Sequence, residues 1–292
     1  MSLADAVNEA ITRATGEVFR AKRTRDVAGG DIHAASVVED GARRYFVKAN
    51  RAANLPMFEA EAAALDALAA AHTLRVPRPV VSGTADGRAF LVLEFFDLAG
   101  RGDAARLGEQ LAALHRVPQA RFGWTRDNWI GATPQPNPAS EDWIAFWRDA
   151  RLGFQFALAA KNGYGGALQR DGETLRANLA AFFDGYTPVP SLLHGDLWGG
   201  NHGYLPDGTP VLFDPACYVG DRECDLAMTE LFGGFAADFH AAYRAAWPLD
   251  AGYAVRRTLY NLYHILNHAN LFGGGYAAQA ARMTASLLAH IR

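Results

Sequence analysis

The sequence of 292 residues contains only two cysteines, Cys217 and Cys224. Their spacing gives neither a disulfide framework nor the paired pattern of a zinc site, so we expect a reducing compartment. No run approaches the ~18 consecutive apolar residues that a membrane-spanning helix needs. The start of the chain also lacks the basic and then apolar pattern of a signal peptide, because Asp5 and Glu9 interrupt it. We therefore expect a cytoplasmic protein with no membrane partner.

Charge of one sign and several well-known enzyme signatures are also missing. The net charge is only −3, so the composition does not indicate nucleic acid as a partner. The sequence contains no Gly-x-Ser-x-Gly elbow, no Walker A loop and no Gly-x-Gly-x-x-Gly motif, which excludes the reaction classes built on them. Half of the residues are hydrophobic, enough for buried cores in a chain whose length suits two lobes.

The pattern of apolar residues predicts a small antiparallel-sheet lobe over residues 1–97. Short β-like runs bounded by turn residues predict strands, and Ala- and Leu-rich runs predict helices: strands at 31–38, 45–48, 79–83 and 89–96, and helices at 4–14 and 57–71. The last strand is nearly all apolar and is expected at the centre of the sheet. In the longer helix, Glu61 falls on the apolar stripe, where a buried carboxylate needs a partner.

From Ala104 onward most of the chain is predicted to be helical. Two loop-rich stretches interrupt the helices, at 116–140 and 188–217. The sequence therefore predicts an α+β protein with a larger, mainly helical C-terminal lobe over 98–292 and a hinge near 94–98.

The most informative segment combines His194-Gly-Asp196 with Asn201, which follows Asp196 after four intervening residues. Kinase catalytic loops use this spacing: the aspartate meets the acceptor hydroxyl as base, and the asparagine binds Mg²⁺. The apolar run 210–214 follows and ends in Asp214, where kinases place a second metal ligand. We expect these side chains to converge at one site.

Two upstream features fit the same chemistry. Lys48 ends a predicted strand, where a kinase has its phosphate-contacting lysine, and Glu61 is the expected ion-pair partner. Gly29 and Gly30 would let backbone N–H groups approach phosphates. Each feature alone also has an ordinary explanation, because a Gly-Gly pair is often only a turn and a lysine at a strand end is usually solvated.

Two histidine positions have competing interpretations. His194 precedes the predicted base and is expected to brace the loop by hydrogen bonds rather than to act as an acid or base. His264 and His268 are spaced for one face of a helix and could bind zinc, but the metalloprotease glutamate is missing. A packed histidine or a substrate-pocket wall is the favoured interpretation of His268.

The catalytic segment closely resembles the fructosamine kinase (ketosamine-3-kinase) family, within the wider aminoglycoside phosphotransferase and choline kinase-like group. The resemblance rests on 194–201, Asp214-Pro-Ala and 220–228, and it extends along nearly the whole chain, through 46–50, 57–61, 127–135, 142–143, 267–270 and 272–273. It implies a bilobal protein-kinase-like fold and phosphorylation of the sugar 3-hydroxyl of ketosamines, for protein deglycation.

Carried over position by position, the resemblance implies roles for the site residues. Asp196 would be the base, and Asn201 and Asp214 would bind Mg²⁺. ATP would lie between the lobes, with its phosphates near Lys48, Glu61, Gly29 and Gly30 and its adenine against the hinge near Glu94 and Phe96. Asp225 would brace the catalytic loop through its backbone, and Trp198 and His268 would line the substrate site.

Two departures and two alternatives accompany the resemblance. Some members carry a redox-sensitive cysteine where this chain has Asp31, so redox regulation is not expected. Gly199 replaces a serine that is usual in the family, with no expected consequence. The alternatives are a kinase for an aminoglycoside, choline or homoserine, and a pseudokinase that binds ATP without turnover. The preferred sugar, a free or protein-bound ketosamine, and the oligomeric state are left open.

Overall fold

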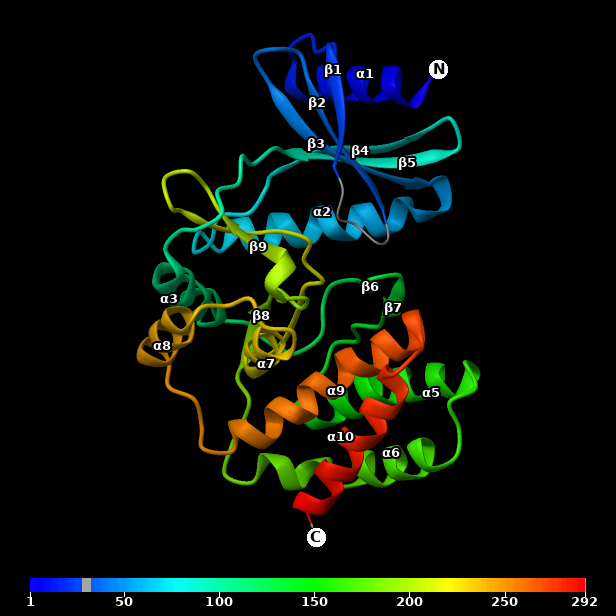
Figure 1. Ribbon diagram of the computed structural model, residues 1–292, viewed down its shortest axis with the longest axis vertical. Coiled ribbons are helices and arrows are strands. Elements are labelled where there is room, and N and C mark those ends of the chain that lie inside the picture. Colours follow the sequence, from blue (N-terminus) through cyan, green and yellow to red (C-terminus); the bar gives the residue numbers. More distant parts are fainter. Residues whose placement is uncertain (28–32, 292) are drawn as a thin grey trace. The chain divides into compact units, whose positions relative to one another are not determined.

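The computed structural model describes residues 1–27 and 33–291. The chain divides into two compact units, Met1–Asp103 with Gly203–Pro215 and Ala104–His202 with Ala216–Arg292. The first contains a five-stranded antiparallel sheet, and the second is mainly helical (Figure 1). The predicted α+β class is therefore confirmed. The predictions for Gly29, Gly30 and Asp31 lie outside the described residues.

The sheet of the first unit has the strand order β1-β2-β3-β5-β4. Its strands are β1 (Arg23–Val27), β2 (Ala34–Glu39), β3 (Arg44–Arg51), β4 (Pro79–Ala85) and β5 (Arg88–Glu94). β5 pairs with β3 and β4, and all its residues from Ala89 to Leu93 are buried. This confirms the prediction that the nearly continuous apolar run forms a central strand.

Two helices cover the opposite faces of this sheet, as Figure 1 shows: α1 (Leu3–Thr15) and α2 (Leu55–Ala70). Side chains alternate between the faces along each strand. Val47 and Val92 pack in one cluster with Ile11 of α1. The neighbouring Lys48 points to the other face and reaches Glu61 of α2. A short 3₁₀ turn (Ala52–Asn54) joins β3 to α2.

A later segment of the chain also belongs to the first unit. The Leu205 N–H donates to the Thr209 carbonyl at 2.9 Å, within the turn between β9 (His202–Tyr204) and β10 (Pro210–Leu212). The Leu212 N–H donates to the Arg75 carbonyl at 3.0 Å. These bonds explain why the first unit extends beyond the predicted lobe 1–97. The strand predicted through Asp214 ends at Leu212.

The second unit is built around the long helix α9, which contacts α5, α7 and α10, while α3 packs against α8. Its elements are α3 (Ala104–His115), β6 (Asn128–Ile130), β7 (Thr133–Gln135), α4 (Trp143–Phe146), a π-helical stretch (Trp147–Gly153), α5 (Phe154–Lys161), α6 (Ala167–Ala177), a 3₁₀ turn (Leu179–Phe183), β8 (Pro190–Leu193), a 3₁₀ turn (Gly199–Asn201), β11 (Tyr218–Asp221), α7 (Glu223–Leu231), α8 (Ala237–Ala246), α9 (Tyr253–Phe272) and α10 (Tyr276–His290).

Several short strands were not predicted. β1 has no alternating apolar pattern and is exposed over most of its length, so only its pairing with β2 defines it. β6, β7, β8 and β11 lie in or beside the stretches predicted as loops and form two-stranded ribbons. Such ribbons have three or four residues per strand, and the surrounding core stabilises them rather than local propensity.

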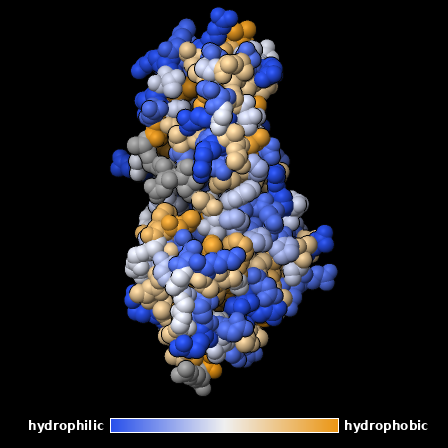
Figure 2. Space-filling view, turned by 90° about the vertical axis from the view of Figure 1, so that its right-hand side faces the viewer, coloured by the Kyte–Doolittle hydropathy of each residue, from blue (hydrophilic) through white to orange (hydrophobic). Residues whose placement is uncertain are grey.

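Each unit has its own hydrophobic core. On the face of the molecule in Figure 2, hydrophobic residues form small groups among hydrophilic ones. None of the helices in the described ranges combines the length and apolar character required to cross a bilayer.

Candidate active site

The loop after β8 holds Asp196 and Asn201 in a fixed relation. Asn201 Nδ2 donates to the Asp196 carbonyl at 2.8 Å and lies 3.3 Å from Asp196 Oδ2. A carbonyl can only accept, so the amide nitrogen must face it. The amide oxygen of Asn201 is therefore turned the other way, and oxygen is the ligand that Mg²⁺ prefers. The structure thus brings together the two residues that the motif spacing paired.

Asp225, in the first turn of α7, holds the backbone just before Asp196. Its Oδ2 accepts the His194 N–H at 2.8 Å, and its Oδ1 accepts the Gly195 N–H at 2.9 Å. His194 is fully buried, and its Nδ1 accepts the Asp196 N–H at 3.3 Å. These hydrogen bonds can hold the backbone of the loop in one conformation. The effect of Asp225 and His194 on turnover stays a prediction.

Gly195 permits the sharp turn between these two contacts. Its φ is +83°, and a Cβ there would lie 2.1 Å from the Ala216 carbonyl oxygen. We expect Gly195→Ala to lower the free energy of unfolding by about 3 kcal/mol or more, because strain and backbone overlap add. Gly185 is the matched control, since its φ is +70° with nothing within 4 Å, and Gly185→Ala should cost ~1–2 kcal/mol. Equal losses in urea titrations would contradict the overlap.

Lys48, Glu61 and Asp214 form a cluster of ion pairs in the first unit. Lys48 Nζ lies 2.6 Å from Glu61 Oε1 and 2.6 Å from Asp214 Oδ1. Lys48 is 6% exposed, whereas the side chain of Asp214 is 49% exposed. The predicted ion pair with Glu61 is present, and Asp214 joins it from the segment after β10. Asp214 has φ +57°, unusual for a non-glycine residue.

Two carboxylates share one ammonium in this cluster. Burial, and then the charge of Asp214, raise the pKa of Glu61, although Lys48 opposes them. Burial alone would lower the pKa of Lys48, but the two carboxylates together raise it above its ordinary value. The lysine is therefore charged, and a metal cation beside Asp214 would further favour ionised carboxylates in the cluster.

The hinge segment at the end of β5 is held by Arg75. Its guanidinium pairs with the Glu94 carboxylate and lies 5.0 Å from the centre of the Phe96 ring. The other carboxylate oxygen of Glu94 accepts the Arg78 N–H at 3.2 Å. The side chain of Glu94 therefore fixes the shape of the hinge, and contact of this segment with a nucleotide stays a prediction.

An aromatic surface adjoins the catalytic loop. Trp198 and Phe232 are 41% and 43% exposed, and the His268 ring lies 5.0 Å from the Phe232 ring. A Cβ at Gly199 would lie 2.8 Å from the carbonyl oxygen of Gly233. Glycine at position 199 thus lets the turn after Phe232 approach the loop, so it has a structural consequence that the sequence did not reveal.

His268 presents one defined ring nitrogen to its surroundings. Its Nδ1 lies 2.8 Å from the His264 carbonyl and must donate to it, so the neutral ring has an unprotonated Nε2. Burial, and then the nearby His268, lower the pKa of His264 to about 3. Within 1–27 and 33–291 no three His, Cys, Asp or Glu side chains are grouped as for a metal ion. Asn201 and Asp214 as magnesium ligands therefore stay a prediction.

Comparisons with known proteins agree with this geometry. The fructosamine kinase family model matches residues 3–290. The chain belongs to the fructosamine kinase family. It is 47% identical over 281 residues to a probable ketoamine kinase of Synechocystis sp., covering 95% of this chain and 94% of that one. It is 43% identical to the chloroplastic protein-ribulosamine 3-kinase of Arabidopsis thaliana, covering 91% and 82%.

Solved structures establish the fold. A candidate fructosamine-3-kinase from Haemophilus somnus superposes with a TM-score of 0.89 at 28% identity, covering 97% of this chain and 96% of that one. An aminoglycoside phosphotransferase at 13% identity shares the fold alone, with a TM-score of 0.66 over 95% and 98% of the chains. The chain is therefore a phosphotransferase with a protein-kinase-like fold, as predicted.

The predicted site residues of this family member fall into two groups. Lys48, Glu61 and Asp214 contact one another in the first unit, which also holds Glu94 and Phe96. The second unit holds Asp196, Asn201, His194, Asp225, Trp198 and His268. Convergence of the two groups on one nucleotide stays a prediction.

His33 is a neighbour of the lysine cluster that the sequence did not reveal. The Arg51 N–H donates to Asn50 Oδ1 at 2.7 Å, so Asn50 Nδ2 faces His33 Nδ1, at 2.8 Å, and donates to it. The neutral ring therefore carries its proton on Nε2. Burial, and then the Lys48 ammonium, lower the pKa of His33 to about 4. Only its position after the glycine pair could have drawn attention to it.

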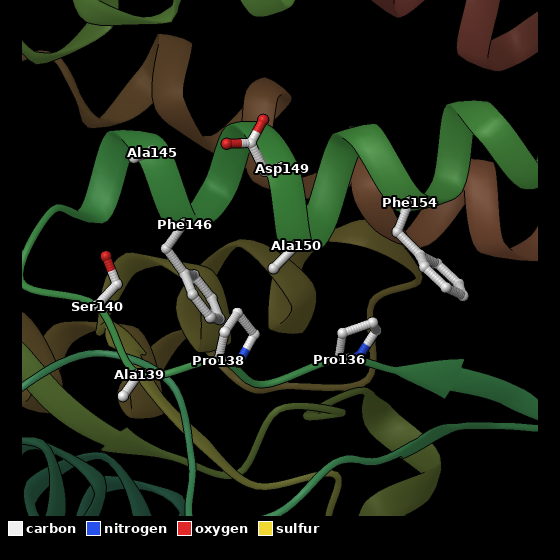
Figure 3. Close-up of a pocket in the computed structure, with 9 residues that line it drawn as sticks. All are labelled: Pro136, Pro138, Ala139, Ser140, Ala145, Phe146, Asp149, Ala150 and Phe154. Carbon is white, nitrogen blue, oxygen red and sulfur yellow. The ribbon is translucent and has the colours of Figure 1, made fainter.

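The second unit also contains a hollow of about 430 Å³, which is lined by other residues than those described above. Figure 3 shows it between the prolines of the segment after β7 and the helical run that begins with α4. Phe146 lies against Pro138, while the Asp149 carboxylate projects from the opposite side of the helix (Figure 3) and pairs with Arg148 at 2.7 Å. No predicted site residue lines the hollow, and most of its lining residues are apolar.

Proposed function

We propose that this phosphotransferase uses Mg·ATP to phosphorylate the 3-hydroxyl of a ketosamine sugar, such as ribulosamine or fructosamine. The observation that carries the proposal is the Asp196–Asn201 loop, held by Asp225, in a chain that belongs to the fructosamine kinase family. The names of the Synechocystis and Arabidopsis relatives support the ketosamine as acceptor. A deglycation role belongs to the same proposal.

In the proposed reaction, Asp196 accepts the proton of the sugar hydroxyl as its oxygen bonds to the γ-phosphorus. The bond from that phosphorus to the β–γ bridging oxygen breaks, and ADP leaves. Lys48 holds phosphate oxygens, and Glu61 holds Lys48. Mg²⁺ on Asn201 and Asp214 would neutralise charge on the phosphates. Positioning and electrostatics supply most of the acceleration, since the transition state is loose.

The path of the chain supports joint action of the two groups of residues. The chain leaves the second unit after His202 and re-enters it at Ala216. Asn201 lies two residues before Gly203, where the chain enters the first unit, and Asp214 lies two residues before Ala216, where it returns. The Ala216 N–H donates to the His194 carbonyl at 2.9 Å. Asn201 is thus part of the catalytic loop, and Asp214 lies two residues from Ala216, which is hydrogen-bonded to that loop.

The aromatic surface suits the acceptor that we propose. Trp198 and Phe232 offer flat apolar faces for the C–H side of a sugar, and aromatic faces also attract the ammonium of a ketosamine. The Nε2 of His268 can accept a hydrogen from a hydroxyl or an ammonium group. Because Trp198 and Phe232 are partly exposed, this surface fits a ketosamine that is free or carried on a protein lysine.

A panel of acceptors tests the proposed function. With Mg·ATP, we expect phosphorylation of free ribulosamine or fructosamine and of glycated lysine, but not of kanamycin, choline or homoserine. ADP release and mass spectrometry of the product are the readouts, and removal of Mg²⁺ with EDTA should stop the reaction. Turnover of only kanamycin, choline or homoserine would replace the acceptor in the proposal. No turnover of any acceptor, with intact ATP binding, would favour a pseudokinase.

A further inference from the structure

The carboxylate that holds the catalytic loop is buried, and within residues 1–27 and 33–291 no lysine or arginine forms an ion pair with it. Asp225 is 1% exposed, and among the described residues its ion-pair partner is His115, whose Nε2 lies 3.1 Å from Oδ2. A buried carboxylate without compensation is costly. Burial alone would raise the pKa of Asp225, yet its interactions with His115, with His194 and with the Gly195 N–H lower it below its ordinary value. The carboxylate is therefore ionised in these surroundings.

Arg222 is a buried cation that is linked to His115 through the Tyr243 hydroxyl. Arg222 is 5% exposed, and the described part of the chain contains no Asp or Glu in an ion pair with it. Its guanidinium donates to the Trp247 carbonyl at 3.1 Å, to the Pro248 carbonyl at 2.6 Å and to the Tyr243 hydroxyl at 3.3 Å. It also lies 4.1 Å from the centre of the Trp247 ring.

The direction of each hydrogen bond between these two charges can be derived. A guanidinium can only donate, so the Tyr243 oxygen accepts from Arg222 and its proton is free to point elsewhere. His115 Nδ1 lies 2.8 Å from that oxygen, and because Nε2 must donate to the Asp225 carboxylate, Nδ1 of the neutral ring accepts the tyrosine proton. The neutral imidazole then carries its own proton on Nε2, which faces Asp225. In this arrangement each of the three hydrogen bonds, from Arg222 to Tyr243, from Tyr243 to His115 and from His115 to Asp225, has one donor and one acceptor.

We propose that Arg222, Tyr243 and His115 form a one-way chain of hydrogen-bond donors that fixes the catalytic loop through Asp225. His115 is the positioning residue at its end: it orients the carboxylate that holds the His194 and Gly195 N–H groups, and thereby the backbone that carries Asp196. Arg222 supplies the first donor of the chain, and the two rings pass the orientation on to Asp225. The consequence for turnover rests on the proposed function.

A simple packing role for His115 makes a different prediction. His115 is fully buried, and its ring meets the Tyr243 ring edge-on at 5.7 Å, where α3 packs against α8. If packing were its whole contribution, a side chain of similar volume would serve as well as one that donates a hydrogen bond. Glutamine and methionine have similar volume, and only glutamine offers an N–H near the place of the imidazole Nε2.

The test therefore compares His115→Gln with His115→Met in the full chain. We expect His115→Met to lower kcat by about 10–100-fold, because a buried hydrogen bond to a charged group is lost. The KM for ATP should stay unchanged, and His115→Gln should restore most of kcat. Equal kcat values in the two variants, at matched melting temperatures, would overturn the proposal, as would wild-type kcat in His115→Met.

A readout without turnover separates this proposal from the proposed function. The sequence has only two His-Gly steps, at 194–195 and 202–203. Labelling histidine carbonyls with ¹³C and glycine nitrogens with ¹⁵N therefore leaves two cross-peaks, with Gly203 as the internal control. His115→Met should move the Gly195 amide proton upfield and His115→Gln should not, whatever the acceptor proves to be. An unmoved Gly195 peak in His115→Met would overturn the chain of donors.

Tyr243→Phe provides a second, milder variant. It removes the hydroxyl between Arg222 and His115 and leaves the ring that packs against α3. The expected loss of kcat has the same direction, and the double variant with His115→Met should be no worse than His115→Met alone, because both changes break one chain. Additive losses of kcat would show that Tyr243 and His115 act independently and would contradict the proposed chain of hydrogen-bond donors.

Discussion

Replacing Asp196 by asparagine is expected to lower kcat for ketosamine phosphorylation by about 10²–10⁴-fold, the usual contribution of a general base. Asparagine has nearly the same shape, so the neighbouring bond from Asn201 Nδ2 to the Asp196 carbonyl, at 2.8 Å, is retained. What is lost is the ability to accept the proton of the sugar hydroxyl. The affinity for Mg·ATP, measured by calorimetry, should remain close to that of the wild type.

The matched control is Asp184→Asn, which changes an exposed carboxylate on the same unit. It should leave both kcat and Mg·ATP affinity at wild-type values. Asp196→Asn turnover near the wild-type rate would refute the assignment of the base. A lost affinity for Mg·ATP with the fold intact would instead place Asp196 among the metal ligands.

The sequence predicted those parts of the site that depend on short spacing. Asp196 and Asn201 share one loop, so their contact follows from five positions of chain. Lys48 and Glu61 were paired because kinases place a lysine at the end of such a strand and because Glu61, on an apolar helical stripe, needs a partner, and the structure has them 2.6 Å apart. Such local patterns fix side-chain direction before any tertiary contact is known.

The rest depends on contacts between distant parts of the chain. His115 lies 110 positions before Asp225, and on an apolar helix it looks like an ordinary packed histidine. Arg75 holds the hinge and the strand β10 at once, which no local pattern indicates. Strand β1 is exposed and charged, so its existence follows only from pairing with β2. In each case tertiary contact overrides or adds to local propensity.

Removing the charge of Lys48 should separate its contributions to stability and to chemistry. Lys48→Met leaves Glu61 buried without its cation, and breaking a buried pair in this way costs ~3–5 kcal/mol of the free energy of unfolding. Phosphoryl transfer should fall by at least about 100-fold, because a fixed cation at the phosphates is lost. The surface change Lys161→Met is the control and should alter neither quantity, since Lys161 is exposed.

The loss of stability should depend on pH in a defined direction. Burial and Asp214 raise the pKa of Glu61 above its ordinary value near 4.5, and without Lys48 nothing in the cluster opposes them. The folded variant then binds the Glu61 proton more tightly than the unfolded chain does. Its free energy of unfolding, relative to wild type, should therefore fall as the pH rises above about 4.5. A deficit that is constant from pH 4 to pH 8 would contradict this account.

The double variant Lys48→Met with Glu61→Leu decides between the two contributions. Replacing both partners of a buried pair by apolar side chains is often neutral for stability, because no unpaired charge remains. Most of the lost free energy of unfolding should therefore return, and its dependence on pH should weaken. Phosphoryl transfer should not return, because the phosphates would still lack the ammonium. Recovery of turnover together with stability would mean that Lys48 serves the fold of the first unit and not the transfer of phosphate.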